Sequence, residues 1–379
     1  MAAVVDLGLP EAGLEPVGFL RISPDGAGNL RWEDGRWTVE DDSLAAVRAR
    51  HGLRVHWPEN AVDLTALLDL AAAGVPLHAD EVPAWAVRAD PVLARLLAAD
   101  GWFGREPRDT PSCTVNLRRE EHSVRLRRHG LARRERAGRG RPDRERGRTP
   151  KVSVVMASMR PHFLETALAQ IARQRGVEAE ILLGLHGVPA GHEAVRRAVA
   201  ACPLPVTMVE ADAGTPFGEV LNLAASRATG DYVAKWDDDD WYGPDHLADL
   251  LLARSYSGAD IVGTAAEFFY LEPLNVTVRR TDYTSEVWSD HVAGGTILTD
   301  REGFRRAGGF PGLPAGVDAA FLKAAHAAGA RIYRTHGLGY VLRRSVSAEH
   351  TWRLSLAHFL RVASNQWRGF RPSLILEMS

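Results

Sequence analysis

Four consecutive aspartates, Asp237–Asp240, are the part of this sequence best suited to chemistry. They directly follow residues 231–236, whose apolar character predicts a buried strand, and a Gly-Pro turn comes shortly after them. Neighbouring carboxylates repel one another, and a hard divalent cation offsets their charge. We therefore expect Mg²⁺ or Mn²⁺ here, bound directly by Asp239, with Asp237 turned toward the same ion or toward a nearby hydroxyl. A solvated acidic loop is the alternative.

The elements around this run alternate between strand and helix. Apolar strands are predicted at 151–157, 180–185, 206–209 and 231–236, with helices at 161–175, 193–201 and 217–228 between them. Such alternation implies right-handed crossovers and a mainly parallel α/β sheet with helices on both faces. Ligands bind at the carboxyl ends of the strands in these sheets, which is where the aspartates lie.

Residues 151 to about 352 resemble an inverting family 2 glycosyltransferase of bacterial type, with the Rossmann-like GT-A fold. The resemblance rests on motifs in a fixed order, namely 152–161, 221–232, Asp237–Asp240 with Pro244, Gly294-Gly295 with 308–310, Asp318 with the helix and strand after it, Arg343-Arg344, and 350–352. It implies a transferase that moves a sugar from a nucleotide-diphosphate donor to a hydroxyl of a glycan or lipid-linked acceptor. Cell-surface polysaccharide synthesis is the process expected for it.

The resemblance also implies roles for individual residues. Asp237, Asp239 and His350 would hold the metal, while Ser158, Arg160, Asn222, Asp238, Arg343 and Arg344 would contact the nucleotide sugar. Asp318 would be the general base for the acceptor hydroxyl, and Trp288, Gly294 and Gly295 would line the acceptor side. A helix N-cap is the alternative role for Asp318, and a packed or surface histidine is the alternative for His350.

Three positions depart from the family pattern. Val317 stands where a glutamate usually precedes the base, and His186 lies where many relatives carry an acidic residue that pairs with uracil. The first turn, residues 157–160, lacks the aromatic side chain that often stacks on the nucleobase. The donor nucleotide therefore stays open among UDP, GDP, dTDP and CDP.

Two other functions compete with sugar transfer. A sugar nucleotidyltransferase has a related sheet but opens with a glycine-rich phosphate loop, whereas residues 157–161 contain no glycine. A catalytically decayed module that only binds a nucleotide sugar would explain Val317. The intact aspartate run argues against decay.

The 379-residue chain is long enough for two or three domains, and 45% hydrophobic with 25% charged residues excludes wholesale disorder. We expect an accessory domain of unknown role at 1–117, either α/β or mostly helical, and a basic helix with a flexible linker at 118–150. The transferase domain would follow at 151–352 and a C-terminal amphipathic helix at 353–379. Residues 118–148 hold 13 arginines and 5 acidic residues, and a solvated helix and linker is the favoured interpretation.

The same patterns bear on location and partners. No apolar run approaches the ~20 residues of a membrane helix, and residues 1–10 lack a cationic signal-peptide start, so we expect a cytoplasmic protein. A peripheral contact with the inner face of the membrane, through the basic stretch and the C-terminal helix, is the alternative. Only three of the 46 basic residues are lysines, which indicates a chain-wide preference for arginine, and no nucleic-acid partner is expected. The sequence does not predict an oligomeric state.

Overall fold

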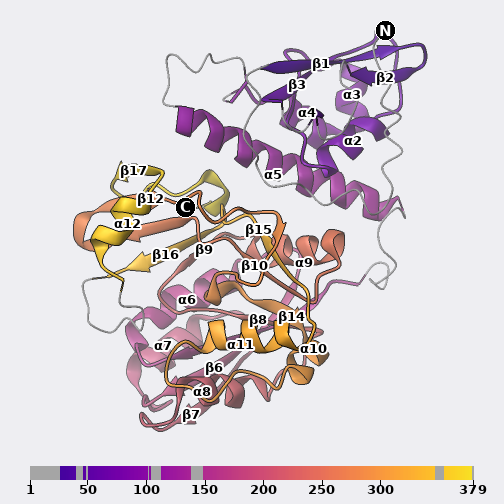
Figure 1. Cartoon of the computed structure of the whole chain (residues 1–379). Coiled ribbons are helices and arrows are strands. Elements are labelled where there is room, and N and C mark those ends of the chain that lie inside the picture. Colours follow the sequence, from indigo (N-terminus) through magenta and orange to yellow (C-terminus); the bar gives the residue numbers. More distant parts are fainter. Residues whose placement is uncertain are drawn as a thin grey trace. The chain divides into compact units, whose positions relative to one another are not determined.

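The computed structural model describes residues 26–39, 46–47, 50–100, 102–103, 112–137, 148–345 and 354–377. The chain divides into two compact units, residues 1–144 and 145–379 (Figure 1). Within the described residues, every helix is too short or too polar to cross a membrane.

Within its described residues, the first unit combines a small sheet with helices α2 to α5. Its sheet has the order β2-β1-β3-β4, formed by β1 (Ala27–Glu33), β2 (Arg36–Val39), β3 (Gly52–His56) and β4 (Leu77–His78). The helices are α2 (Thr65–Ala72), α3 (Ala84–Ala89), α4 (Pro91–Leu97) and α5 (Ser112–Arg136). Leu67 and Leu70 of α2 and Leu126 of α5 are fully buried in its core. Of the two folds that the sequence left open, the first unit is therefore α/β.

Helix α5 differs from the solvated linker helix that its arginines suggest. It packs along α2 and continues to Arg136. A Cβ at Gly130 would lie 2.6 Å from the backbone nitrogen of Ala72, so the glycine permits close helix contact here. Arg119 is buried, and its Nε donates to the backbone oxygen of His51 at 2.5 Å. The helix belongs to the first unit because it completes that unit's core, and residues 138–147 of the predicted linker lie outside the described residues.

The second unit is built on an eight-stranded sheet of order β13-β15-β10-β14-β8-β5-β6-β7. The strands are β5 (Lys151–Ser158), β6 (Glu178–His186), β7 (Val206–Ala211), β8 (Tyr232–Lys235), β10 (Ile261–Thr264), β13 (Val287–Trp288), β14 (Leu298–Asp300) and β15 (Ile332–Thr335). Only β13 and β14 run antiparallel to the other six. The predicted mainly parallel α/β sheet is confirmed.

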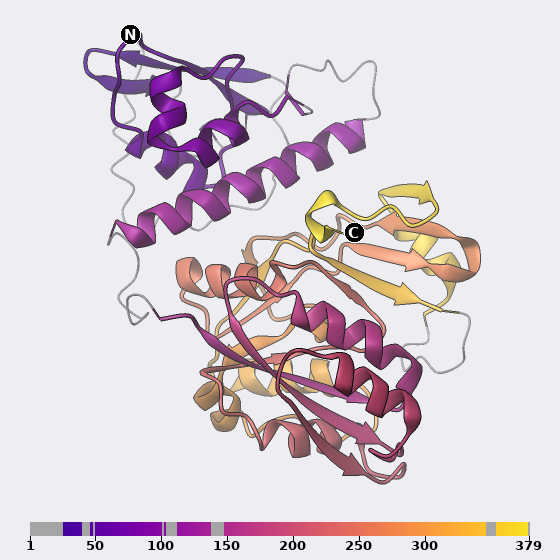
Figure 2. The same ribbon diagram turned by 180° about the vertical axis from the view of Figure 1, so that it is seen from behind.

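Helices cover both faces of this sheet. One face carries α6 (Leu164–Ala172), α7 (Glu193–Ala201) and α9 (His246–Ser257), and the other carries α8 (Phe217–Ala225), α10 (Arg301–Arg306) and α11 (Val317–Ala327). Figure 1 is seen from the side of α11, and Figure 2 shows the side of α6 and α7. Val154 and Met156 of β5 enter one core, while Val155 and Ala157 enter the other, because successive side chains on a strand point to opposite faces. This explains why β5 reads as an unbroken apolar run.

A second sheet, of order β17-β12-β11-β16-β9, was not predicted. It comprises β9 (Trp241–Tyr242), β11 (Phe268–Leu271), β12 (Val276–Arg279), β16 (Tyr340–Arg344) and β17 (Asn365–Arg368), with a 3₁₀ turn η3 (Glu272–Leu274). The single helix predicted for the C-terminal segment is instead a short helix, α12 (Leu356–Val362), followed by β17 and a 3₁₀ turn η5 (Leu374–Leu376). The segment divides because β17 pairs with β12 at the edge of the sheet, while Phe359 of α12 packs on Phe269 with ring centroids 4.8 Å apart.

Candidate active site

The aspartate run forms the turn between β8 and β9, at the carboxyl end of β8 and next to the carboxyl end of β5. The turn folds around Tyr242, which is fully buried and stacks on Trp236 with ring centroids 3.6 Å apart. The Tyr242 hydroxyl accepts a hydrogen bond from the backbone N–H of Asp237 at 3.0 Å and donates to the backbone oxygen of Gly295 at 3.0 Å. One tyrosine therefore joins the run to the glycine pair predicted on the acceptor side.

The four aspartates have different surroundings, so they do not act as equivalent ligands. Asp240 is buried and accepts hydrogen bonds from the Tyr340 hydroxyl and from the backbone N–H of Arg343, the latter at 2.9 Å. Burial raises its pKa well above the ordinary value, and the charges of Asp239 and Asp237 add to the increase. Asp240 thus anchors the turn to β16.

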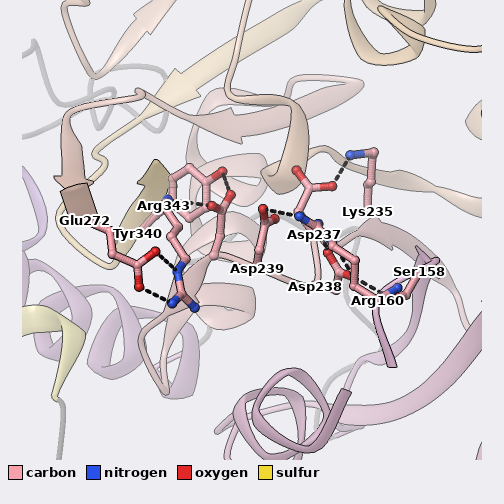
Figure 3. Close-up of polar contacts among 10 residues, drawn as sticks. Ser158, Arg160, Lys235, Asp237, Asp238, Asp239, Glu272, Tyr340 and Arg343 are labelled. Atoms are coloured by element: carbon pink, nitrogen blue, oxygen red, sulfur yellow. Dashed lines mark hydrogen bonds and ion pairs between the residues drawn. The ribbon is translucent and has the colours of Figure 1, made fainter. Parts of the chain in front are cut away.

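Asp238 and Asp239 share one cation, Arg160, which follows the end of β5 (Figure 3). The Arg160 Nη1 lies 2.8 Å from Asp239 Oδ2, and its Nη2 pairs with Asp238 Oδ1. Ser158 also donates its hydroxyl to Asp238. Burial raises the pKa of Asp238 to about 6, although the Arg160 charge opposes the change. Ser158, Arg160 and Asp238, all predicted on the nucleotide side, are therefore in mutual contact.

Lys235, the last residue of β8, joins Asp237 to Asp318. Its side chain is 1% exposed, and its Nζ lies 2.5 Å from Asp237 Oδ1 and 3.2 Å from Asp318 Oδ1. Burial lowers the pKa of Lys235, but the two carboxylates outweigh burial and raise it overall. Burial raises the pKa of Asp318, with Lys235 opposing that change and Asp237 adding to it.

The structure excludes the N-cap role considered for Asp318. The N-cap of α11 is Gly316, which adopts a left-handed conformation with φ of 69°, and Asp318 is the second residue of the helix. The carboxylate therefore lies in the first turn, near the positive end of the helix dipole. Its neighbours include Lys235 and Gly294.

The glycine pair lies against the two carboxylates that Lys235 joins. A Cβ at Gly294 would overlap Asp318 Oδ2 and lie 2.7 Å from Asp318 Cγ. A Cβ at Gly295 would lie 2.6 Å from Asp237 Oδ2 and 2.7 Å from the Tyr242 hydroxyl oxygen. Both residues belong to a 3₁₀ turn, η4 (Gly294–Thr296). Residues predicted from three separate motifs thus meet at one place.

Two other predicted residues make contacts of a different kind. Asn222 binds the backbone of Phe310 through both ends of its amide, at 2.7 and 2.8 Å. Arg344 donates from Nη2 to the backbone oxygen of Leu354 at 2.9 Å and lies over the Phe359 ring, so it holds the C-terminal helix. These contacts provide no evidence for the predicted role of Asn222 or Arg344 in nucleotide-sugar binding.

Arg343 was predicted to bind the nucleotide sugar and Trp288 to line the acceptor side, and the structure describes the surroundings of both. The Arg343 guanidinium lies between the rings of Phe163 and Trp241, 4.9 and 5.3 Å from their centroids, and its Nη2 is 2.5 Å from Glu272 Oε1. Trp288 is 42% exposed on the edge strand β13, and three strands separate it from β8 in the sheet. His350, the third predicted metal ligand, lies outside the described residues.

Some contacts had no clear signal in the sequence. The positions of Tyr242, Tyr340 and Glu272 follow from strand pairing in the second sheet, which the sequence did not predict. The role of Lys235 was visible only as a cation next to an acidic run, without its second partner, Asp318.

The side chains present suit a divalent ion whose remaining ligands come from the substrate and water. Asp237 and Asp239 offer hard carboxylate oxygens, the ligands that Mg²⁺ and Mn²⁺ prefer. Among the described residues, no group of three or more His, Cys, Asp or Glu side chains is placed to hold a metal. Mg²⁺ in particular usually keeps waters and binds through one or two carboxylates together with substrate phosphates, so a smaller protein ligand set is sufficient. Arg160 contacts Asp239 and would compete with such an ion.

Residues 153–308 match the family model described as Glycosyl transferase family 2. They form a family 2 glycosyltransferase domain. The matched residues contain the aspartate run, Lys235 and the glycine pair, while Asp318 follows ten residues after their end.

Solved structures provide a second comparison. The chain is similar to the mannosyltransferase PcManGT from Pyrobaculum calidifontis in complex with GDP-Man and Mn²⁺, at 22% identity and a TM-score of 0.45, over 61% of this chain and 68% of that one. It is also similar to S. aureus TarS 1-349 in complex with UDP-GlcNAc, at 19% identity and a TM-score of 0.43, over 56% of this chain and 64% of that one. The similarity to TarS 1-349 thus spans just under two thirds of that chain. No significant match was found among curated proteins.

Proposed function

We propose that this glycosyltransferase moves a sugar from a nucleotide-diphosphate donor to a hydroxyl of a glycan or lipid-linked acceptor, by a metal-dependent, inverting single displacement. One observation carries the proposal. Asp318, from a distant helix, meets the aspartate run at the carboxyl end of β8, where α/β sheets bind their ligands.

The donor side must stabilise a diphosphate that gains negative charge as it leaves. A Mg²⁺ or Mn²⁺ ion held by Asp239 and Asp237 would act there as a Lewis acid. Arg160 contributes a cation at the same edge of the sheet. Asp238 is fixed by Ser158 and Arg160, which suits a carboxylate that orients the nucleotide.

The acceptor side needs a group that takes the proton of the attacking hydroxyl. Asp318 is suited to this task because it is a partly buried carboxylate whose position is set by the Lys235 ammonium. Gly294 leaves room for this carboxylate, and Gly295 leaves room for Asp237. Trp288, being exposed, is proposed as a platform for a more remote part of the acceptor.

Catalytic decay is the competing function, and the surroundings of Val317 bear on it. Val317 is 2% exposed and packs in the core beneath α11. A valine at this position is explained by packing, and its presence therefore does not indicate decay.

A thermal-shift panel tests the proposal. We would measure the full chain and Asp239→Ala with UDP, GDP, dTDP, CDP and their sugar conjugates, with and without Mn²⁺. A ligand at a hundred times its dissociation constant stabilises the fold by about 2.7 kcal/mol. We expect one nucleotide class to raise the Tm only with metal and only when Asp239 is present, and that class to be hydrolysed to the nucleoside diphosphate. The exposed Asp100, changed to alanine in the first unit, is the matched control.

Two outcomes would contradict the proposal. If no nucleotide raises the Tm of the wild type, the aspartate run is not a diphosphate site. If a nucleotide binds with metal but no conjugate is turned over, the binding-module function is correct. The cell-surface process, the cytoplasmic location and the peripheral membrane contact stay predictions from the sequence.

A further inference from the structure

Lys235 is a buried cation at the centre of the candidate active site. It ends β8, between β5 and β14, and the whole residue is 2% exposed. Burying an ammonium group is unfavourable unless its charge is matched by close partners. Its partners are Asp237 and Asp318, at 2.5 and 3.2 Å.

The three residues come from different elements. Asp237 lies in the turn after β8, whereas Asp318 lies in the first turn of α11, 81 positions further along the chain. Two carboxylates close together repel each other, more strongly in a protein interior than in water. A single ammonium between them offsets this repulsion and fixes the direction of both side chains. Lys235 therefore controls where the Asp318 carboxylate lies relative to Asp237.

We propose that Lys235 is a positioning residue for sugar transfer, which holds the carboxylate of the base Asp318 at a fixed position relative to Asp237 on the donor side. The inference rests on the proposed function. In the reaction, the acceptor oxygen forms a bond to the anomeric carbon while the bond from that carbon to the diphosphate breaks. The hydroxyl proton goes to the Asp318 carboxylate, and the diphosphate leaves with the bonding electrons. Lys235 keeps its proton throughout and acts only through the two carboxylates.

This role differs from a purely structural one in what its loss would change. If Lys235 only stabilises the fold, its removal lowers the Tm, and the molecules that remain folded keep their kcat. If it positions Asp318, its removal lowers kcat in folded protein and leaves the donor KM nearly unchanged. A displacement of 1 Å in a reacting group lowers a rate by about 100-fold.

The experiment compares Lys235→Met, which keeps an unbranched side chain one heavy atom shorter and removes its charge, with Lys323→Met. Lys323 is exposed on α11, the helix that carries Asp318, and serves as the matched control. The full-length proteins would be assayed with Mn²⁺ for hydrolysis of UDP-glucose, UDP-N-acetylglucosamine, GDP-mannose, dTDP-glucose and CDP-glucose, with water as the acceptor. For the substrate that the wild type hydrolyses, we expect Lys235→Met to lower kcat about 100-fold. Its KM should stay within about threefold of the wild-type value, and Lys323→Met should match the wild type.

A second variant keeps the test valid if Lys235→Met is unstable. Lys235→Ala leaves space for a small amine, so propylammonium should restore part of its kcat in a saturable way. Propanol, which is similar in size but uncharged, should not. A variant that is unstable and is not rescued by the amine would show a structural role and overturn the inference.

The outcomes separate this inference from the proposed function. A wild type that hydrolyses none of the five donors refutes the proposed function, and the role of Lys235 in the reaction falls with it. An active wild type with an unchanged kcat in Lys235→Met refutes the inference alone. A rise in KM equal to the fall in kcat/KM also refutes it, because Lys235 would then act in donor binding.

Discussion

Replacing Gly294 with alanine tests whether the position of Asp318 determines activity. The φ of Gly294 is not in the left-handed region, so alanine fits the backbone and the effect is steric. The new Cβ would lie 2.7 Å from Asp318 Cγ, whereas carbon atoms in good contact are about 3.5 Å apart or more. The carboxyl group must therefore move by about 1 Å. A displacement of this size lowers the rate about 100-fold, or ~2.7 kcal/mol in activation free energy.

The assay is the kcat for nucleotide-sugar hydrolysis, measured together with the Tm. Overpacking a closely packed site also destabilises a fold by about 1–3 kcal/mol, so the comparison must be made well below the Tm of the variant. Gly191→Ala is the control, because a Cβ at Gly191 meets no atom within 4 Å and its φ is not left-handed either. A folded Gly294→Ala protein with a kcat within threefold of Gly191→Ala would refute the assignment of Asp318 as the base.

Two further predictions concern stability. Burial lowers the pKa of His122 to about 4, a change opposed by its hydrogen bond to the backbone oxygen of Leu77 and favoured by the charge of Arg125. The folded protein thus binds fewer protons than the unfolded chain, and the stability that neutral His122 provides above pH 6.5 should fall by about 2–3 kcal/mol as the pH drops from 6.5 to 4. Urea unfolding at pH 7 and pH 5 should show a smaller pH dependence for His122→Phe than for the wild type, and an equal dependence would contradict this cause. Phe359→Ala removes a fully buried ring of α12 that packs on the second sheet, and should destabilise the second unit by about 3–5 kcal/mol, as measured by denaturant unfolding. A loss below 1 kcal/mol would show that α12 is not part of that core.

Much of the second unit could be predicted because its signals are local. The apolar run of β5 and the alternation of strands and helices up to β8 indicate a mainly parallel sheet, and the rule that ligands bind at strand ends placed the aspartate run. The second sheet was missed because its strands are two to five residues long and their partners are distant in sequence. Short strands of this kind carry too few residues for a periodic pattern.

In the candidate site, too, some features could be predicted from the sequence and others depended on the packing of distant residues. Asp237–Asp240, Gly294, Gly295 and Asp318 are identified by residue type and family order, and the structure brings Asp237, the glycine pair and Asp318 together. Asn222 and Arg344 were assigned by the same order, and their role in nucleotide-sugar binding stays a prediction; in the structure their side chains bind the backbone of Phe310 and of Leu354. A motif fixes the position of a residue along the chain, but the direction of its side chain depends on what packs around it.

The fold class of the second unit, the acidic run and the resemblance to family 2 could all be inferred from the sequence, since they depend on residue type, on spacing and on the order of motifs. Only the tertiary structure showed that Asp240 anchors the turn, that Asp238 and Asp239 share Arg160, and that Lys235 joins Asp237 to Asp318. The physical reason is that the charge partner of a buried group is chosen by proximity in space. Lys235 and Asp318 are 83 residues apart in the chain and 3.2 Å apart in the fold.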